Sequence, residues 1–327
     1  MDINPKVSVI IPIYNASEFL EECINSILQQ SLKEIEVICV DDGSSDNSLE
    51  ILKKYAQNDC RVKILSQSNQ GAGAARNNGM SNARGEYLSF LDSDDFFDVD
   101  MLKDAYEAAH NSNADVCVFD ADLFNHSTKE FKKCTWAFRR QYFPKEQPFS
   151  PLSPDVKDNI FRMFNGWPWD KLFRREFVQR IHLQYQNLRT TNDMFFVFIG
   201  IARAKRIITV DKVLAHQRIE VKTSLSRTRD KSWDCFYTAL LAMQKELKRI
   251  GIYKELERAF VNWSINFSLW QLNTMTGEAF SKAYNLLKKE GFEQLDITRH
   301  DRSYFYNEKE YNQFLRIFTT PLEKYSQ

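Results

Sequence analysis

The chain has 327 residues, of which 43% are hydrophobic and 13% aromatic, so it can bury a large core as one big domain or two smaller ones. Basic and acidic residues both total 44, and this balance excludes a global preference for nucleic acid. The longest apolar run, Met194 to Ala202, is far shorter than the ~20 residues of a membrane span, and the N-terminal residues lack the basic leader of a secretion signal. Six scattered cysteines without C-x-x-C spacing favour a reducing compartment, which predicts a cytoplasmic protein, soluble or peripheral at the inner face of the membrane.

Short apolar runs alternate with amphipathic stretches over the first 120 residues. The β-branched run from Val7 to Ile13 is typical of a strand covered on both faces, and the helical spacing that follows begins with Asn15 and Glu18 as a capping box. The same pattern predicts further strands at 36–40, 62–65, 87–91 and 116–119, with helices at 49–56, 73–83 and 101–109. This order predicts a doubly wound, Rossmann-like α/β fold.

Polar clusters directly follow three of these predicted strands. They are Asn15, the turn at 41–46 and the acidic run at 92–95. Ligands of doubly wound sheets bind outside the carboxyl ends of the strands, so we expect these three segments to form one site.

The regular alternation ends after Phe124. A basic, aromatic segment and a Pro/Ser-rich segment predict an insertion or lid near 125–165, and residues 190–210 predict a helix followed by a strand. From about residue 231 the pattern is helical and amphipathic. We therefore predict a catalytic domain over 1–230 and a mostly helical C-terminal domain over 231–327.

The acidic run Asp92-Ser93-Asp94-Asp95 crowds three carboxylates at one strand end. Like charges this close repel one another, and a hard divalent cation that also holds phosphate oxygens would relieve the repulsion. Taken alone, a D-x-D sequence is a weak signal, because solvated acidic turns are common.

Four motifs occur in order on successive strand and helix units: SVIIPIYN, VDDGSSD, GAGAARNNG and FLDSDD. With them the chain resembles the family-2 glycosyltransferases of the GT-A fold, closely over the first 125 residues and loosely to Arg218. The resemblance implies an inverting enzyme that uses Mn²⁺ or Mg²⁺. It would transfer a hexose or N-acetylhexosamine from a UDP-sugar to a hydroxyl of a glycan, glycoprotein or lipid-linked acceptor.

The resemblance also implies roles for the motif residues in binding the donor. Pro12 and Tyr14 would line the nucleoside pocket, and Asp41 would accept a hydrogen bond from uracil. Asp94 would coordinate the metal and Asp92 would contact the metal or the ribose. The complete predicted donor set is Pro12, Tyr14, Asp41, Asp42, Arg76, Asp92, Ser93 and Asp94.

The family places its catalytic base on an acidic pair at a helix start, and here that pair reads Asn192-Asp193. Asp193 keeps the position of the base, whereas Asn192 cannot carry a charge. In the alternative interpretation, Asp193 only favours the helix dipole and Thr190, Thr191 or Asn192 caps the helix. A catalytically degenerate binding or scaffold subunit is the corresponding alternative function.

Three residues are predicted to face the acceptor, namely Trp169, Lys171 and Asp95. His216 is a candidate metal or phosphate ligand, with a structural role as the alternative, and residues 222–226 are a candidate lid. The basic segment from Lys132 to Arg140 is a candidate contact for a lipid-linked or protein acceptor. The aromatic helical tail around Trp263 and Trp270 is a candidate contact for a membrane or a second copy in a homodimer, with domain core as the default.

Overall fold

The computed structural model describes residues 4–220 and 225–325. Within them the chain divides into two compact units. The first comprises residues 4–153, 163–187 and 192–220, and the second comprises 154–162, 188–191 and 225–325. The sequence predicted one domain boundary after residue 230. This division differs, because two short segments on either side of residues 163–187 pack with the C-terminal helices.

The first unit is built on a nine-stranded sheet in the order β3-β2-β1-β4-β8-β6-β9-β5, with β7 paired to β6. Its first four strands are parallel and confirm the doubly wound prediction: β1 (Val7–Ile13), β2 (Ile35–Asp41), β3 (Val62–Ser66) and β4 (Tyr87–Phe90). The parallel strand β1 therefore lies between β2 and β4, which brings their carboxyl ends to one edge.

The second half of the sheet is mixed. The strand β8 (Lys171–Arg174), absent from the predicted set, runs antiparallel between β4 and β6 (Val116–Asn125). The long β9 (Ile207–Ile219) pairs parallel with β6, and the two-residue β5 (Phe96–Phe97) pairs antiparallel with β9. A short β7 (Phe131–Lys133) forms a hairpin with β6 inside the predicted insertion.

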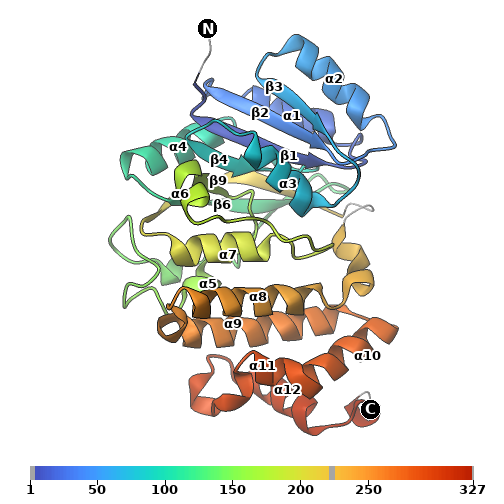
Figure 1. The fold of residues 1–327 in the computed structure, drawn as a ribbon, viewed down its shortest axis with the longest axis vertical. Coiled ribbons are helices and arrows are strands. Elements are labelled where there is room, and N and C mark those ends of the chain that lie inside the picture. The colour runs from blue at the N-terminus through green and yellow to red at the C-terminus, as the bar shows by residue number, and fades with distance from the viewer. Residues whose placement is uncertain (1–3, 221–224, 326–327) are drawn as a thin grey trace. The chain divides into compact units, whose positions relative to one another are not determined.

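Helices cover both faces of this sheet (Figure 1). Side chains at alternate positions of β1, such as Val9 and Ile11, belong to a core shared with α1, α2 and α4. On the other face, α3 approaches through Gly79, where an added Cβ would lie 2.5 Å from Ile10 Cγ2. The helices of this unit are α1 (Leu20–Leu28), α2 (Ser48–Asn58), α3 (Ala72–Ser81), α4 (Met101–Asn111), α6 (Arg175–Arg180) and α7 (Met194–Arg203), with a 3₁₀ turn at Arg140–Tyr142.

The predicted capping box at α1 is wrong. The helix begins at Leu20 after Phe19, and no side chain caps it. Asn15 instead adopts a left-handed backbone conformation with φ 50°, and its Oδ1 accepts hydrogen bonds from the backbone amides of Ser45 and Asp46. Asn15 therefore joins the loops that follow β1 and β2, two of the three segments expected at the site.

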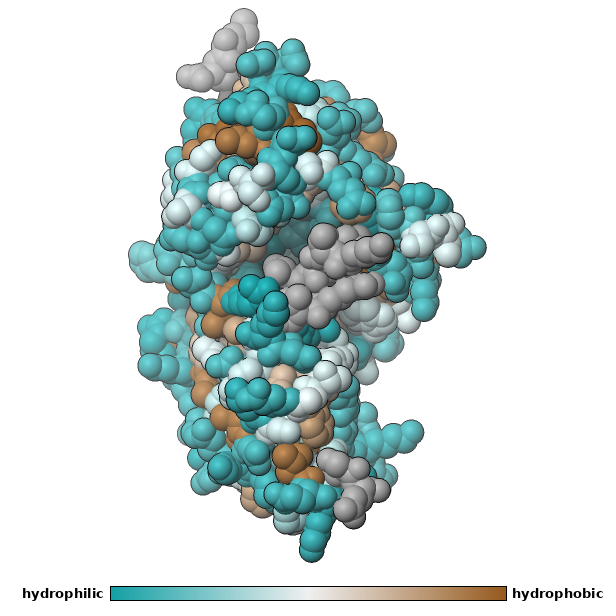
Figure 2. Space-filling model, turned by 90° about the vertical axis from the view of Figure 1, so that its right-hand side faces the viewer, coloured by the Kyte–Doolittle hydropathy of each residue, from teal (hydrophilic) through white to brown (hydrophobic). Residues whose placement is uncertain are grey.

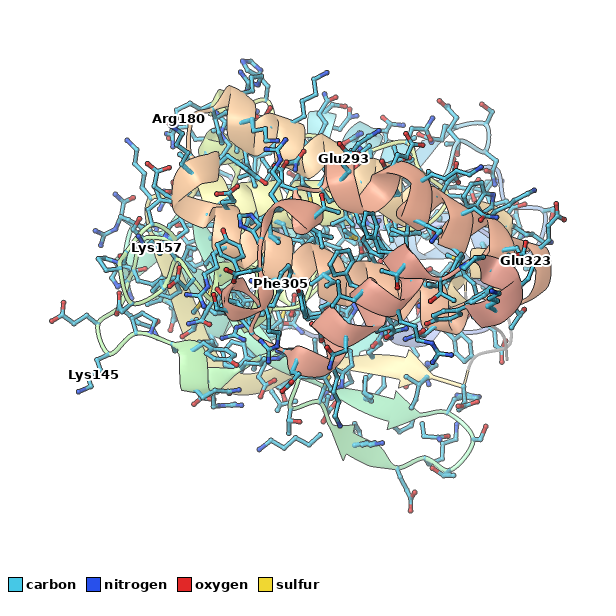
Figure 3. The ribbon with its side chains drawn as sticks, turned by 90° about the horizontal axis from the view of Figure 1, so that it is seen from below. Lys145, Lys157, Arg180, Glu293, Phe305 and Glu323 are labelled. Atoms are coloured by element: carbon cyan, nitrogen blue, oxygen red, sulfur yellow. The ribbon has the colours of Figure 1, made fainter. Side chains whose placement is uncertain are left out.

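The second unit is helical, as predicted for the C-terminal region. In Figure 1 the helices α8 and α9 run side by side, and Figure 3 shows Phe305 among the helices of this unit, where it packs on Tyr311. The α-helices that lie partly or wholly in it are α5 (Ile160–Met163), α8 (Cys235–Arg249), α9 (Tyr253–Thr274), α10 (Gly277–Leu286), α11 (Phe292–Gln294), α12 (Glu308–Thr319) and α13 (Leu322–Tyr325). Short helices of other types lie at Leu225–Ser232, Leu287–Gly291, Ile297–Arg299 and Arg302–Tyr304.

Within the described residues, no helix combines the length and the apolar character that crossing a membrane requires. The face drawn in Figure 2 is mainly hydrophilic, with hydrophobic residues in small groups. In the C-terminal tail, Trp263 stacks on Phe267, whereas Trp270 is 45% exposed and lies under the guanidinium of Arg229. The default interpretation of the tail as domain core therefore holds for Trp263 and only in part for Trp270.

Candidate active site

The carboxyl ends of β1 and β2 form one side of the candidate site. Tyr14, directly after β1, is 53% exposed, so its ring is free to stack on a planar ligand. Asp41 pairs in register with Ile13, is buried, and accepts a hydrogen bond from the Ser44 amide at 3.3 Å. Pro12, one residue before the end of β1, is half-buried.

Asp42 holds the neighbouring loop rather than facing an open surface. One carboxylate oxygen accepts from the Gln67 side chain and the Gln70 amide, and the other accepts from the Gly71 amide at 2.8 Å. Gly43 has φ +76°, and an added Cβ would lie 3.1 Å from the Asn69 nitrogen. Because its carboxylate already has three protein partners, Asp42 would contribute to the predicted donor set by holding the shape of this turn.

The buried Arg76 connects the acidic run to the start of α7. Its guanidinium donates to Asp92 Oδ1 at 2.6 Å and to Asn192 Oδ1 at 2.9 Å, and it lies 5.3 Å from the centre of the Tyr185 ring. An arginine is therefore one of the positive charges among the crowded aspartates. Asn192, the departure from the family's acidic pair, accepts a hydrogen bond from the same arginine through its neutral oxygen.

A second arginine, Arg218 near the end of β9, fixes the other half of the acidic run. Its backbone amide donates to Asp95 Oδ1 at 2.7 Å, and its Nε donates to the Asp94 carbonyl at 2.9 Å. The guanidinium also donates to Glu22 and lies against the rings of Phe19, Phe96 and Phe124, with the side chain only 1% exposed. Arg218 thus holds the backbone that carries Asp94 in place.

These arrangements separate the roles of the three aspartates. Burial raises the pKa of Asp94 to about 6, and the charge of Asp92 adds to the rise. Burial, with Asp94 and Asp92, also raises the pKa of Asp95 well above its ordinary value. Asp95 is 3% exposed and bonded to Arg218, which contradicts its predicted place at the acceptor. Asp92, Ser93 and Asp94 remain partly exposed.

We expect Arg218→Lys to raise the Mn²⁺ concentration needed for half-maximal activity roughly tenfold or more, because a lysine cannot keep the charged hydrogen bonds to both the Asp94 carbonyl and Glu22. The measurement is turnover against Mn²⁺ concentration at saturating donor. Arg175→Lys is the matched control, since Arg175 Nε likewise donates to a backbone carbonyl, that of Gly85, away from the acidic run. If the Mn²⁺ requirement were unchanged, or rose equally in Arg175→Lys, Arg218 would not have the role of holding the backbone of Asp94 in place.

Asp193 lies at the N-cap of α7, which confirms its predicted place at a helix start. No side chain caps this helix, so the alternative in which Thr190, Thr191 or Asn192 caps it is wrong. Among the described residues, only the backbone of Asp193 itself donates to this carboxylate. Burial raises its pKa; Arg76 opposes the rise, and the charge of Asp92 adds to it. A free carboxylate with a raised pKa is suited to accepting a proton.

The predicted acceptor residues Trp169 and Lys171 are both in the interior. Trp169 is 1% exposed and stacks on Trp167 at 4.5 Å between ring centres. Lys171 is fully buried and its ammonium donates to Asp170 and to the carbonyls of Asn165 and Trp167. Neither side chain can reach an acceptor, because β8 is a central strand rather than a loop.

Lys171→Met should cost about 3–5 kcal/mol of the free energy of unfolding at neutral pH, because it leaves the buried Asp170 without its cation. Burial raises the pKa of Asp170 to about 6 even with Lys171 present. Without Lys171 the carboxyl takes up a proton more readily, so the loss should shrink as the pH falls towards 5. Urea denaturation at two pH values measures both effects. In the double variant with Asp170→Asn, stability should partly recover, and a single variant as stable as wild type would refute the buried pair.

His216, a candidate ligand for a metal or phosphate, contacts an aspartate of the neighbouring strand. Its Nδ1 contacts Asp122 Oδ1 at 2.7 Å, and its ring stacks on Phe96. Among the described residues, no three His, Cys, Asp or Glu side chains gather as ligands for an ion, and the contact with Asp122 favours the structural alternative for His216, whose metal or phosphate role stays a prediction. The contact follows from the parallel pairing of β9 with β6, which sets His216 opposite Asp122. The side chains of the candidate lid at 222–226 lie outside the described part of the chain.

Arg218 and Tyr185 contribute to the site through features that sequence reasoning missed. Arg218 reaches the acidic run through the pairing of β9 with β5 and β6, which joins segments distant in the sequence. Tyr185 stacks on Phe196 of α7 at 4.1 Å and lies beside Arg76. A lone arginine or tyrosine outside the four motifs carries no spacing signal that could have identified either residue.

Comparisons with known proteins agree with this geometry. The family model described as Glycosyl transferase family 2 matches residues 8–181, more than half of the chain. The putative glycosyltransferase EpsH of Bacillus subtilis is 28% identical over 88% of this chain and 82% of its own length. Among solved structures, S. aureus TarS 1-349 in complex with UDP-GlcNAc has a TM-score of 0.67 at 21% identity, covering 98% of this chain and 92% of that one. The mannosyltransferase PcManGT of Pyrobaculum calidifontis, in complex with GDP-Man and Mn²⁺, has a TM-score of 0.55 at 16% identity over 97% and 88%.

Proposed function

The chain belongs to glycosyl transferase family 2 and is a glycosyltransferase, and we propose that it transfers a hexose or N-acetylhexosamine from a UDP-sugar to a hydroxyl of a glycan acceptor with inversion. The observation that carries this proposal is that one buried arginine, Arg76, links the acidic run to the residue before Asp193. Asp92 and the neighbour of Asp193 both accept from Arg76, so the donor corner and the free carboxylate of Asp193 lie around one buried cation.

The donor corner suits a hard divalent cation. Asp92 and Asp94, separated by one residue, both offer carboxylate oxygens, and the pKa of Asp94 is raised by burial and by the charge of Asp92. The described residues supply no third acidic, His or Cys ligand, so diphosphate and water oxygens would have to complete the shell. Bound there, Mn²⁺ or Mg²⁺ would stabilise the negative charge that develops on the departing diphosphate.

The protein's own groups would perform the rest of the reaction. Tyr14 and Asp41 hold the nucleoside end of the donor at the β1 and β2 ends. Asp193 accepts the proton of the acceptor hydroxyl while that oxygen bonds to the anomeric carbon. The bond from the anomeric carbon to the diphosphate oxygen breaks with its electron pair on the diphosphate, and Asp193 ends the step protonated. A single displacement of this kind inverts the configuration at the anomeric carbon.

A degenerate binding or scaffold subunit is the weaker proposal. Its sequence motivation was the missing charge at Asn192 and the irregular His216 segment. In the structure Asn192 accepts from Arg76 and His216 pairs with Asp122, so both departures have structural partners while Asp193 keeps a free carboxylate. Neither departure removes a group that the proposed reaction uses.

Turnover of donors tests this function. The purified protein is incubated with Mn²⁺ and UDP-linked glucose, galactose and their N-acetyl forms, and release of the nucleoside diphosphate is followed with and without chelator. GDP-mannose is the mismatched control. The proposal predicts release from one or two UDP-sugars and only with metal. Release from GDP-mannose alone would overturn the donor assignment, and UDP binding without release of sugar to water or to any acceptor would favour the scaffold.

A further inference from the structure

Trp136, in the predicted insertion, is 47% exposed although the segment around it is anchored in the core. Its neighbours Cys134, Ala137 and Phe138 are each 2% exposed or less. Burial of a tryptophan contributes more than that of most side chains, so a fixed segment that leaves one in water forgoes a large gain in stability. This combination is typical of an aromatic side chain held ready for a ligand.

Backbone pairing places Trp136 beside a second tryptophan. The Asn165 amide donates to the Ala137 carbonyl and the Arg139 amide donates to the Met163 carbonyl, both at 3.0 Å. This antiparallel pairing brings Trp136 next to Trp167, with ring centres 5.1 Å apart and the rings at 64°. Trp167 is itself partly exposed. The two rings therefore form the two sides of an aromatic corner.

Ionic and polar contacts hold this corner rigidly. Arg140, four residues after Trp136, forms ion pairs with the buried Asp120 and with Asp211. Arg139 Nε donates to the Trp136 carbonyl at 3.0 Å. Behind Trp167, the ring of Trp169 stacks at 4.5 Å and the ammonium of Lys171 donates to the Trp167 carbonyl at 2.8 Å. Because both tryptophans are already held in place, they would lose little further conformational entropy when a ligand binds.

The corner adjoins the candidate base. An added Cβ at Gly166, the residue before Trp167, would lie 3.0 Å from the Phe198 ring and 3.8 Å from Met194 Cγ. Met194 directly follows Asp193 in α7. The buried Lys171, which holds the Trp167 carbonyl, also interacts electrostatically with Asp193.

We propose that Trp136 and Trp167 form a subsite that binds a sugar ring of the acceptor glycan next to Asp193. Aromatic faces pack on the C–H faces of sugar rings, and the indole N–H groups can donate to hydroxyls. The inference rests on the proposed function, since it assumes a glycan acceptor. It replaces Trp169 and Lys171, which lie beneath this surface, as the residues that contact the acceptor.

Fluorine NMR of protein labelled with 5-fluorotryptophan tests the subsite. The six tryptophans are assigned by single Trp→Phe variants, and the labelled full chain with UDP and Mg²⁺ is titrated with the methyl glycosides of glucose, galactose and N-acetylglucosamine. We expect the signals of Trp136 and Trp167 to shift with at least one glycoside. Trp270, 45% exposed in the other unit, is the matched control and should not shift. In Trp136→Ala, the shift of the Trp167 signal should be lost.

Three results would overturn the subsite. The first is no shift at Trp136 and Trp167 with any of the glycosides while calorimetry detects UDP binding, which leaves the proposed function intact. The second is an equal shift at Trp270. The third is a response of Trp136 to anionic phospholipid vesicles and not to glycosides, which would assign this basic, aromatic segment to a membrane surface. If UDP itself does not bind, the proposed function fails and the subsite fails with it.

Discussion

Asp193→Asn should lower kcat about 10²–10⁴-fold, the usual contribution of a positioned general base. The amide of asparagine has the same shape as the carboxylate and can occupy the N-cap of α7, so the fold should be retained. The amide cannot accept the proton of the acceptor hydroxyl, so the base is lost. The measurement is the initial rate of UDP release. Asp100→Asn is the matched control, because Asp100 is also a helix N-cap, that of α4, and hydrogen-bonds only Ser31 through its side chain.

The pH dependence of the wild type should identify the same group. Asp193 must be ionised to act, and burial raises its pKa above the ordinary value of ~3.9. The rate should therefore fall as the pH drops through this raised pKa, and the acid limb should lie above pH ~4. Loss of a general base would lower the rate far more than twofold. If the rate of Asp193→Asn stayed within a factor of about two of the wild-type rate, Asp193 would not be the base.

Asp94→Ala should abolish metal-dependent turnover. Metal stabilisation of a leaving diphosphate contributes several kcal/mol, so we expect a loss of about 10³-fold. Among the described residues, only the backbone of Asp94 itself donates to its carboxylate, and Arg218 holds its backbone carbonyl, so removal of the carboxylate should leave the fold intact. Calorimetry of UDP with and without Mn²⁺ gives a second readout: the wild type should bind UDP more tightly with Mn²⁺ and the variant should not.

Asp98→Ala provides the comparison for Asp94. It removes a carboxylate four residues further along the chain. The Asp98 carboxylate accepts a hydrogen bond from the Asp100 amide. The Mn²⁺ dependence of this variant should equal that of the wild type. If Asp94→Ala kept the wild-type dependence of UDP binding on Mn²⁺, the cation would have to bind elsewhere and the acidic run would have another role.

The parallel half of the sheet could be predicted because its residues are constrained locally. Continuous β-branched runs such as Val7–Ile13 leave few alternatives to a buried parallel strand, and polar turns at their ends follow from the topology. The resemblance to the family placed Asp193 at a helix start, and the apolar pattern of residues 190–210 predicted that helix. These features depend on residues near one another in the sequence.

The mixed half could not be predicted, because it depends on pairing between distant segments. Nothing in the residues of β8 indicates that this strand inserts between β4 and β6, and that insertion buries Lys171 and Trp169. Likewise, the pairing of β9 with β6 sets His216 opposite Asp122 and brings Arg218 to Asp95. The errors in the predicted site therefore lie where long-range pairing decides which way a side chain faces.

The central claim is a single displacement in which Asp193 activates the acceptor on the side of the sugar opposite the diphosphate. Its most direct test is proton NMR of the sugar released from an α-linked UDP-sugar, recorded before the product can mutarotate. The account predicts that the first product is the β-anomer. An α-anomer as the first product would contradict a single displacement and with it the role proposed for Asp193.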